Sequence, residues 1–159
     1  MDEEAIIRKT AEYVRGNLSG EGSGHDWWHV HRVWKNAVHI ARSENVRLFV
    51  VRIAAGETAN LFVVQLAALL HDISDWKFND GDVNAGPELA REWLEKLQVD
   101  EDIISHVYEI IRDISFKGAG VKTQMRTIEG MIAQNAERIE AIGAIRMDRT
   151  FAYGGNRGQ

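Results

Sequence analysis

Histidine and aspartate stand side by side at His71-Asp72, directly after the strongly apolar run 61–70. An apolar helix that ends in two adjacent metal-ligand side chains would deliver them to the edge of a buried core. A polar pair on the last turn of a helix is also common at protein surfaces, and the pair alone favours that structural role. The interpretation changes because further histidines precede it, at His25 and His29. Imidazole and carboxylate groups together suit a divalent metal ion and leave positions open for water and substrate.

His25 and His29 are four residues apart, so on a helix they share one face. The same spacing occurs in zinc proteases, but their His-Glu-x-x-His pattern is absent from this sequence. A lone histidine on a helix is most often a surface residue or a hydrogen-bonded core residue. That structural interpretation is given to His31, His39 and His106.

Composition excludes several classes of function. The 159 residues correspond to about one domain, with 45% apolar and 27% charged residues. A net charge of −5 gives no reason to expect general binding to nucleic acid or to a membrane. The absence of cysteine excludes disulfides, thiolate ligands and a thiol nucleophile. No signal peptide is recognisable and run 61–70 is too short to cross a bilayer, so we expect a soluble, cytoplasmic protein.

The pattern of residues predicts an all-α fold. A single proline and few alternating apolar and polar runs favour helices over strands. We expect one compact domain of six to seven helices over 1–153, followed by a disordered tail over 154–159. Asp26, Asp100 and Thr127 are suitable helix N-caps, and Pro87 suits a first helical turn. The expected helices cover 3–16, 26 into the forties, 61–75, 87–97, 101–113, 127–142 and, as a short last helix, 144–151.

A short internal repeat lies between the second and third expected helices. Residues 38–51 (VHIARSENVRLFVV) and 51–64 (VRIAAGETANLFVV) agree at 8 of 14 positions when shifted by 13. Two apolar helical stretches could agree by chance, but the block LFVV occurring twice favours a tandem duplication. Thirteen residues are too few for a solenoid unit. We therefore interpret the insert as an extension of the connection between these helices.

Four motifs together resemble the HD-domain metal-dependent phosphohydrolases, most closely the small bacterial branch of predicted HD-superfamily hydrolases. The resemblance covers nearly the whole chain. It implies an all-helical fold and a divalent ion (Mn, Fe, Co, Ni, Zn or Mg) held by a histidine, a His-Asp pair and a distant aspartate. It further implies hydrolysis of phosphate esters or anhydrides, with nucleotides the favoured substrates. The motifs are HDWWHVHRV at 25–33, AALLHDI at 67–73, SFKG at 115–118, and QNAERIEAIG at 134–143 with RTFAYGG at 149–155.

Matched to that family by position, His29, His71 and Asp72 are the first three expected metal ligands. The fourth position, where the family has aspartate, falls on Asn135. An amide oxygen can bind a metal ion, but it is neutral and a weaker donor than a carboxylate for a hard ion. Glu137 is two residues further on, roughly 200° around a helix, and is not expected to substitute. Related proteins also continue with more helix beyond the Gly-Gly.

In the mechanism that the resemblance suggests, a bound ion activates water and orients a phosphoryl oxygen. Asp72 and Asp75 are the candidate catalytic residues, because Asp75 lies one helical turn beyond His71 and could accept the proton as general base. Capping the helix or pairing with Lys77 is an equally good role for Asp75. The candidate phosphate-binding residues are Arg32, Lys77 and Lys117, although isolated basic residues are more often solvated surface.

Weaker expectations concern the surroundings of this site. Glu129 could orient a metal-binding side chain by contacting it on the side away from the ion. Trp28, Trp76 and Phe78 could stack on a base, although aromatic residues beside loops more often form the edge of a core.

The leading hypothesis is a metal-dependent phosphohydrolase acting on a nucleotide or a similar small phosphate compound. The alternative is a degenerate HD module that binds nucleotide or metal without turnover, because Asn135 replaces the usual aspartate. A third possibility is a structural helical protein with no site. A small phosphorylated substrate is the expected partner, a homodimer is possible, and no nucleic acid or membrane partner is expected.

Overall fold

A computed structural model of the chain describes residues 2–18, 26–43, 58–74, 84–114 and 125–142. In these ranges the chain forms six α-helices and no strand, which confirms the predicted all-α fold. The predicted short helix 144–151, the tail 154–159 and most of the repeat between 38 and 64 lie outside the described residues. The helices are α1 (Glu3–Asn17), α2 (Trp27–Arg42), α4 (Leu61–Leu70), α5 (Ala85–Lys96), α6 (Glu101–Ile114) and α7 (Ile128–Ile142).

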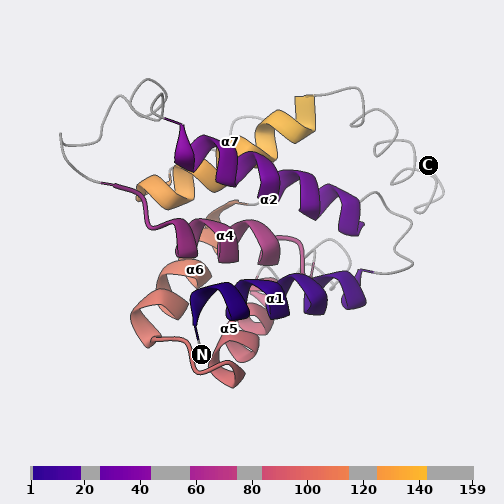
Figure 1. Cartoon of the computed structure of the whole chain (residues 1–159), viewed down its shortest axis with the longest axis vertical. Coiled ribbons are helices and arrows are strands. Elements are labelled where there is room, and N and C mark those ends of the chain that lie inside the picture. The colour runs from indigo at the N-terminus through magenta and orange to yellow at the C-terminus, as the bar shows by residue number, and fades with distance from the viewer. Residues whose placement is uncertain (1, 19–25, 44–57, 75–83, 115–124, 143–159) are drawn as a thin grey trace.

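Helix α4 lies at the centre of the molecule. Figure 1 shows α2 and α7 on one side of it and α1, α5 and α6 on the other, and α4 contacts four of these five helices directly. Eight of its ten residues are buried, and Leu66, Leu69 and Leu70 are fully enclosed. A helix that is apolar on every face is stable only when it is covered on every face. The side chain of Asn60 caps its start by accepting hydrogen bonds from the backbone N–H groups of Phe62 and Val63.

Helices α2 and α7 form the layer that carries the histidine and glutamate motifs. The predicted N-caps are confirmed: Asp26 Oδ1 accepts from the backbone N–H of His29 at 2.9 Å, and Thr127 Oγ1 accepts from that of Gly130 at 3.2 Å. Both helices pack on α4 through a small apolar cluster rich in alanine, whose short side chains let helices approach closely. This cluster consists of Val33, Ala37, Val64, Ala68, Ile132 and Ala136.

Helices α1, α5 and α6 cover the opposite side of α4. The α5–α6 pair is joined by a turn in which Gln98 has a positive φ of 57°. Tyr13 of α1 stacks on Trp93 of α5 with ring centroids 3.9 Å apart, and Trp93 Nε1 donates to Thr10 Oγ1 at 3.0 Å. Neither α1 nor any other described helix has both the length and the apolar character needed to span a bilayer.

The predicted helix bounds agree with the structure to within two residues, with one exception. The helix expected over 61–75 ends at Leu70, and His71 is its C-cap. Residues 71–74 form a turn, whose backbone is held by the Ile73 N–H donating to the Leu70 carbonyl at 3.1 Å. His71 and Asp72 therefore project from the end of the central helix and not from its side.

Candidate metal centre

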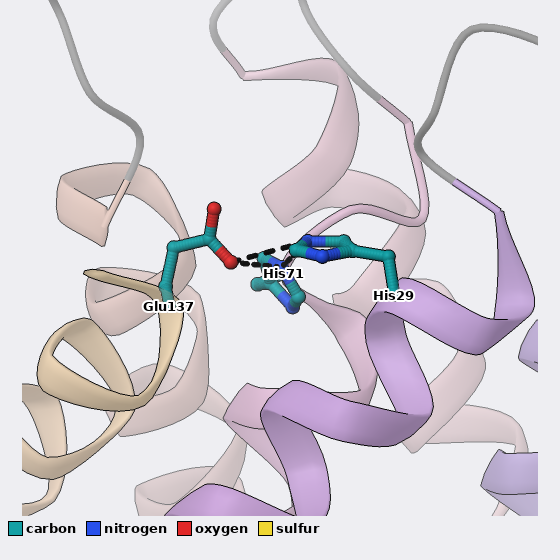
Figure 2. A group of neighbouring side chains, drawn as sticks. All are labelled: His29, His71 and Glu137. Atoms are coloured by element: carbon teal, nitrogen blue, oxygen red, sulfur yellow. Dashed lines mark hydrogen bonds and ion pairs between the residues drawn. The ribbon is translucent and has the colours of Figure 1, made fainter. Parts of the chain in front are cut away.

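Three side chains from three different helices converge at one end of α4. His29 comes from the first turn of α2, His71 from the C-cap of α4 and Glu137 from the second half of α7 (Figure 2). One potential ligand atom from each lies within 4.8 Å of the other two. Both histidines are buried, with His29 fully inaccessible, and the Glu137 side chain is 26% exposed. The group is therefore enclosed on the protein side and reachable from solvent past the glutamate.

The distances between these atoms are short. His29 Nε2 and His71 Nε2 are 3.4 Å apart. Glu137 Oε2 lies 3.1 Å from the first nitrogen and 3.3 Å from the second. Asp72 Oδ2 adds a second carboxylate oxygen, 3.3 Å from His29 Nε2 and 3.5 Å from His71 Nε2. Two imidazole nitrogens and two carboxylate oxygens thus surround one small volume.

The hydrogen bonds behind the histidines direct their Nε2 atoms inward. His71 Nδ1 donates to the backbone carbonyl of Ala68 at 2.9 Å. In a neutral imidazole this leaves the lone pair on Nε2, which points at the other three side chains. Nδ1 of His29 faces Glu140 Oε1 at 3.8 Å, which favours the same tautomer. An imidazole fixed in this way by a carbonyl or carboxylate is the usual arrangement of a metal-binding histidine.

The electrostatics of the metal-free site are those of a cation-binding site. Burial lowers the pKa of His71, but the carboxylates of Asp72 and Glu137 outweigh it and raise this pKa to about 9. The pKa of His29 is also raised, because its interactions with Asp72 and Glu137 exceed the effect of burial. Burial raises the pKa of Glu137, but the two histidines outweigh it and lower this pKa to about 2. Protons on the histidines therefore supply positive charge between the carboxylates.

One buried carboxylate oxygen at this site lacks a hydrogen-bond donor among the described residues. Glu137 Oε2 is buried and, among the described residues, has no hydrogen-bond partner with acceptable geometry, only the two close histidine nitrogens. A buried polar atom without a partner is costly and rare in native proteins. A divalent cation held by His29, His71, Asp72 and Glu137 would satisfy this oxygen and both imidazole lone pairs. The nitrogen and oxygen donors are of the kinds that bind Zn, Mn, Fe, Co or Ni.

The structure brings together three of the four ligands predicted from the sequence, His29, His71 and Asp72. On α7, however, the carboxylate of Glu137 lies beside both histidines, and Asn135, two residues earlier, is half-buried. Two residues on a helix differ by about 200°, so only one of this pair can point at the site. This helix turns residue 137 toward α2 and α4, so the Glu137 carboxylate is a second candidate for the ligand position that the sequence assigns to Asn135.

Arg32 and Glu129 have protein partners in the structure. Arg32 Nε donates to Glu140 Oε1 at 2.8 Å. Glu129 Oε1 accepts from the backbone N–H of Asn60 at 2.8 Å and so ties the start of α7 to the start of α4. Glu129 precedes Glu137 by more than two helical turns, and its orienting role stays a prediction.

Of the other predicted residues, one is exposed and the rest lie outside the described residues. Trp28 is on the surface, with 59% of its area exposed. Asp75, the expected general base, and the expected phosphate-binding Lys77 and Lys117 lie outside the described residues, as do His25, Trp76 and Phe78.

The residues predicted from the sequence did not include the face of α7 that lies beside the histidines. Glu137 and Glu140 are three residues apart and both lie toward α2, next to the buried Ala133 and Ala136. The sequence did contain a signal for this face. Small residues such as alanine mark the side of a helix that packs on other helices, and the two glutamates lie next to that side. In the motif shared with the HD family, the aspartate position falls on Asn135 instead.

Comparison with known proteins shows which family the chain belongs to. The HD domain family matches residues 27–142, and the chain belongs to that family. The match begins at the first residue of α2 and ends at the last residue of α7, so it includes all four residues of the candidate centre.

A curated relative and several solved structures are similar. Over 147 residues the chain is 34% identical to the uncharacterized protein YpgQ of Bacillus subtilis; the alignment covers 92% of this chain and 65% of YpgQ. The crystal structure of YpgQ in complex with ADP has a TM-score of 0.64 at 27% identity, covering 96% of this chain and 69% of YpgQ. The chain thus spans about two thirds of the length of this relative.

Two further crystal structures have the same fold. A Lactobacillus plantarum protein gives a TM-score of 0.75 at 29% identity, covering 99% of this chain and 66% of that protein. A predicted HD superfamily hydrolase from an uncultured Thermotogales bacterium gives 0.66 at 28% identity, covering 94% of this chain and 76% of that protein.

Proposed function

We propose that this chain is a metal-dependent phosphohydrolase that acts on a nucleotide or a similar small phosphate compound. The observation that carries the proposal is the convergence of His29 Nε2, His71 Nε2 and the orphaned Glu137 Oε2, with Asp72 Oδ2 beside them. When bound there, a divalent ion supplies Lewis-acid activation of water and of a phosphoryl oxygen. Membership of the HD family supports the reaction class.

The protein side chains have distinct proposed roles. His29, His71, Asp72 and Glu137 hold the ion, and Glu137 takes the place first assigned to Asn135. Asp72 and Glu137 have 14% and 26% of their side chains exposed, so substrate and water would reach the ion from the side of these carboxylates. Asp75, three residues beyond Asp72, remains the proposed general base, and Lys77 and Lys117 the proposed phosphate-binding residues.

A nucleotide is the proposed substrate class for two reasons. YpgQ, a relative with the same fold, has been crystallised with ADP. The resemblance of the motifs to HD phosphohydrolases implies the same class. The net charge of −5 makes the protein's overall field unfavourable for an anionic substrate, so binding depends on local groups near the ion.

The test is hydrolysis by protein stripped with chelator and reloaded with Mn²⁺, Co²⁺ or Ni²⁺. We expect release of phosphate or pyrophosphate from at least one member of a panel of nucleoside mono-, di- and triphosphates. Activity should vanish in His71→Ala and persist in His39→Ala, a matched histidine of α2 that lies outside the centre. Metal binding without hydrolysis of any panel member would contradict the proposal.

The alternative is a module that binds nucleotide or metal without turnover, as Asn135 in the family's aspartate position suggests. It predicts that ADP binds to the metal-loaded protein and is recovered intact. It also predicts that Asn135→Asp creates activity. The enzyme hypothesis predicts little effect of Asn135→Asp, because the Glu137 carboxylate already occupies the site.

A further inference from the structure

A third carboxylate lies behind the candidate metal centre. Glu140, one turn after Glu137 on α7, is buried with 7% of its side chain exposed. Its Oε1 accepts from Arg32 Nε at 2.8 Å and lies 3.8 Å from His29 Nδ1, on the far side of the imidazole from the candidate metal ligands. A single carboxylate oxygen therefore faces both an arginine and a histidine of α2.

We propose that Arg32 and Glu140 are positioning residues that act through His29, so that Arg32 fixes Glu140 and Glu140 orients the His29 ring for metal binding. The proposal rests on the proposed function, because it requires that a metal ion binds at His29. It differs from the expectation that Arg32 binds substrate phosphate. It also gives a function to Glu140, which the motif analysis left without one.

The spacing along each helix makes this arrangement possible. His29 and Arg32 are three residues apart on α2 and present side chains to the same neighbouring helix. Glu137 and Glu140 have the same separation on α7. The two helices therefore meet through two pairs at successive turns, His29 with Glu137 and Arg32 with Glu140. The first pair would hold the ion, and the second would support the first.

The chemistry favours a role beyond packing. A carboxylate behind a ligating imidazole fixes the tautomer with Nδ1–H and makes Nε2 a better donor. The 3.8 Å separation is longer than a hydrogen bond, so Glu140 acts here as a nearby negative charge that orients the ring. Without an anchor a buried glutamate side chain has several rotamers. The Arg32 hydrogen bond, made by a side chain that is one-third exposed, restricts them.

The experiment measures Co²⁺ affinity of the full chain after chelator treatment, by competition with a chromophoric chelator and by the visible spectrum of bound Co²⁺. No substrate is present, so substrate binding cannot contribute. The variants are Glu140→Gln, Arg32→Met and the double variant. The matched control is Glu101→Gln, since Arg91 Nη1 and Glu101 Oε1 also lie 2.8 Å apart but join α5 to α6 at the surface.

We expect Glu140→Gln to weaken Co²⁺ binding by about 10–100-fold, the usual effect of losing a residue that supports a metal ligand. Arg32→Met should cause part of that loss, and Glu101→Gln none. Because Arg32 acts through Glu140, adding Arg32→Met to Glu140→Gln should cause no further loss. The Co²⁺ spectrum should change in the same variants.

Three results would overturn the inference. Unchanged Co²⁺ affinity in Arg32→Met would contradict it even if Glu140→Gln failed to fold, because that variant leaves the carboxylate in place. Additive losses in the double variant would show that Arg32 acts independently of Glu140. Failure of the unmodified protein to bind Co²⁺ would refute the proposed function as well, whereas binding that is indifferent to both residues would refute only this inference.

Discussion

Glu137 Oε2 lies 3.1 Å from His29 Nε2, a contact that joins α7 to α2 across the end of the central helix. The same oxygen is 3.3 Å from His71 Nε2 and is buried without a hydrogen bond from any described residue. In the absence of a cation, the raised pKa values of the two histidines compensate the carboxylate by holding protons. The carboxylates at this site therefore stabilise a positive charge, which either the histidine protons or a metal ion can supply.

The first prediction separates the two candidate ligands of α7. Glu137→Gln should weaken binding of Co²⁺ or Mn²⁺ by at least the ~10–100-fold typical of a supporting residue, because it removes a ligand charge directly. Asn135→Ala, two residues away on the same helix, should change the affinity less than Glu137→Gln does. Both affinities can be measured by competition with a chromophoric chelator. A larger loss in Asn135→Ala than in Glu137→Gln would restore Asn135 as the ligand.

The second prediction concerns the pH dependence of stability in metal-free protein. His71 has a folded pKa of about 9 against an ordinary 6.5, so its stabilising effect is complete below pH 6.5 and lost as pH rises through about 9. Glu137 has a folded pKa of about 2 against 4.5, so its contribution is complete above pH 4.5 and lost as pH falls toward 2. We expect maximal stability between about pH 4.5 and 6.5.

Urea unfolding of chelator-treated protein at pH 5.5, 7.5 and 9 measures this effect. The free energy of unfolding should fall across the series. The fall should be smaller in His71→Gln, which lacks the titrating group. A saturating divalent metal should reverse the trend, because the ion must displace protons from the imidazoles and binds better as pH rises. Equal stabilities at pH 5.5 and 9 would mean that the histidines are neutral in the folded protein.

The third prediction tests the central position of α4. Leu66 is fully buried, so Leu66→Ala should cost about 2–5 kcal/mol of unfolding free energy through lost burial and the cavity left behind. Leu89 of α5 is 37% exposed, and Leu89→Ala should cost much less. Chemical denaturation of both variants gives the comparison. Similar losses in the two would contradict the central placement of α4.

Much of the fold follows from local sequence signals. The apolar run 61–70 indicated a helix covered on all sides, and α4 is such a helix. Asp26 and Thr127 marked the starts of α2 and α7 because short polar side chains satisfy the first N–H groups of a helix. His71-Asp72 was expected at the end of the buried helix, and this placement needed no knowledge of neighbouring helices.

The α7 residue that lies beside the two histidines could not be obtained in the same way. It depends on the rotation of α7 about its own axis, which is set by the packing of Ala133 and Ala136 against α2 and α4. A rotation of about 200° separates Asn135 from Glu137, so a motif aligned by residue type alone does not decide which of the two faces the histidines. The partner of Arg32 was unpredictable for a related reason, because Glu140 is 108 residues away along the chain.

The last prediction concerns the turn that carries the His71-Asp72 pair. Gly86, in the first turn of α5, packs against this turn so closely that a Cβ atom there would lie 2.9 Å from the backbone oxygen of Ser74. Gly86→Ala should therefore displace residues 71–74, cost about 1–3 kcal/mol of stability and weaken Co²⁺ binding.

The matched control for Gly86→Ala is Gly16→Ala in α1, where a Cβ atom would meet nothing within 4 Å. That substitution should stabilise the protein by about 0.5–1 kcal/mol, because alanine loses less backbone entropy than glycine in a helix. It should leave Co²⁺ affinity unchanged. Chemical denaturation measures the stability of both variants, and titration with Co²⁺ measures their metal affinity. A stabilising Gly86→Ala with unchanged metal affinity would show that the close packing of α5 on the turn does not help to hold His71 and Asp72 in place.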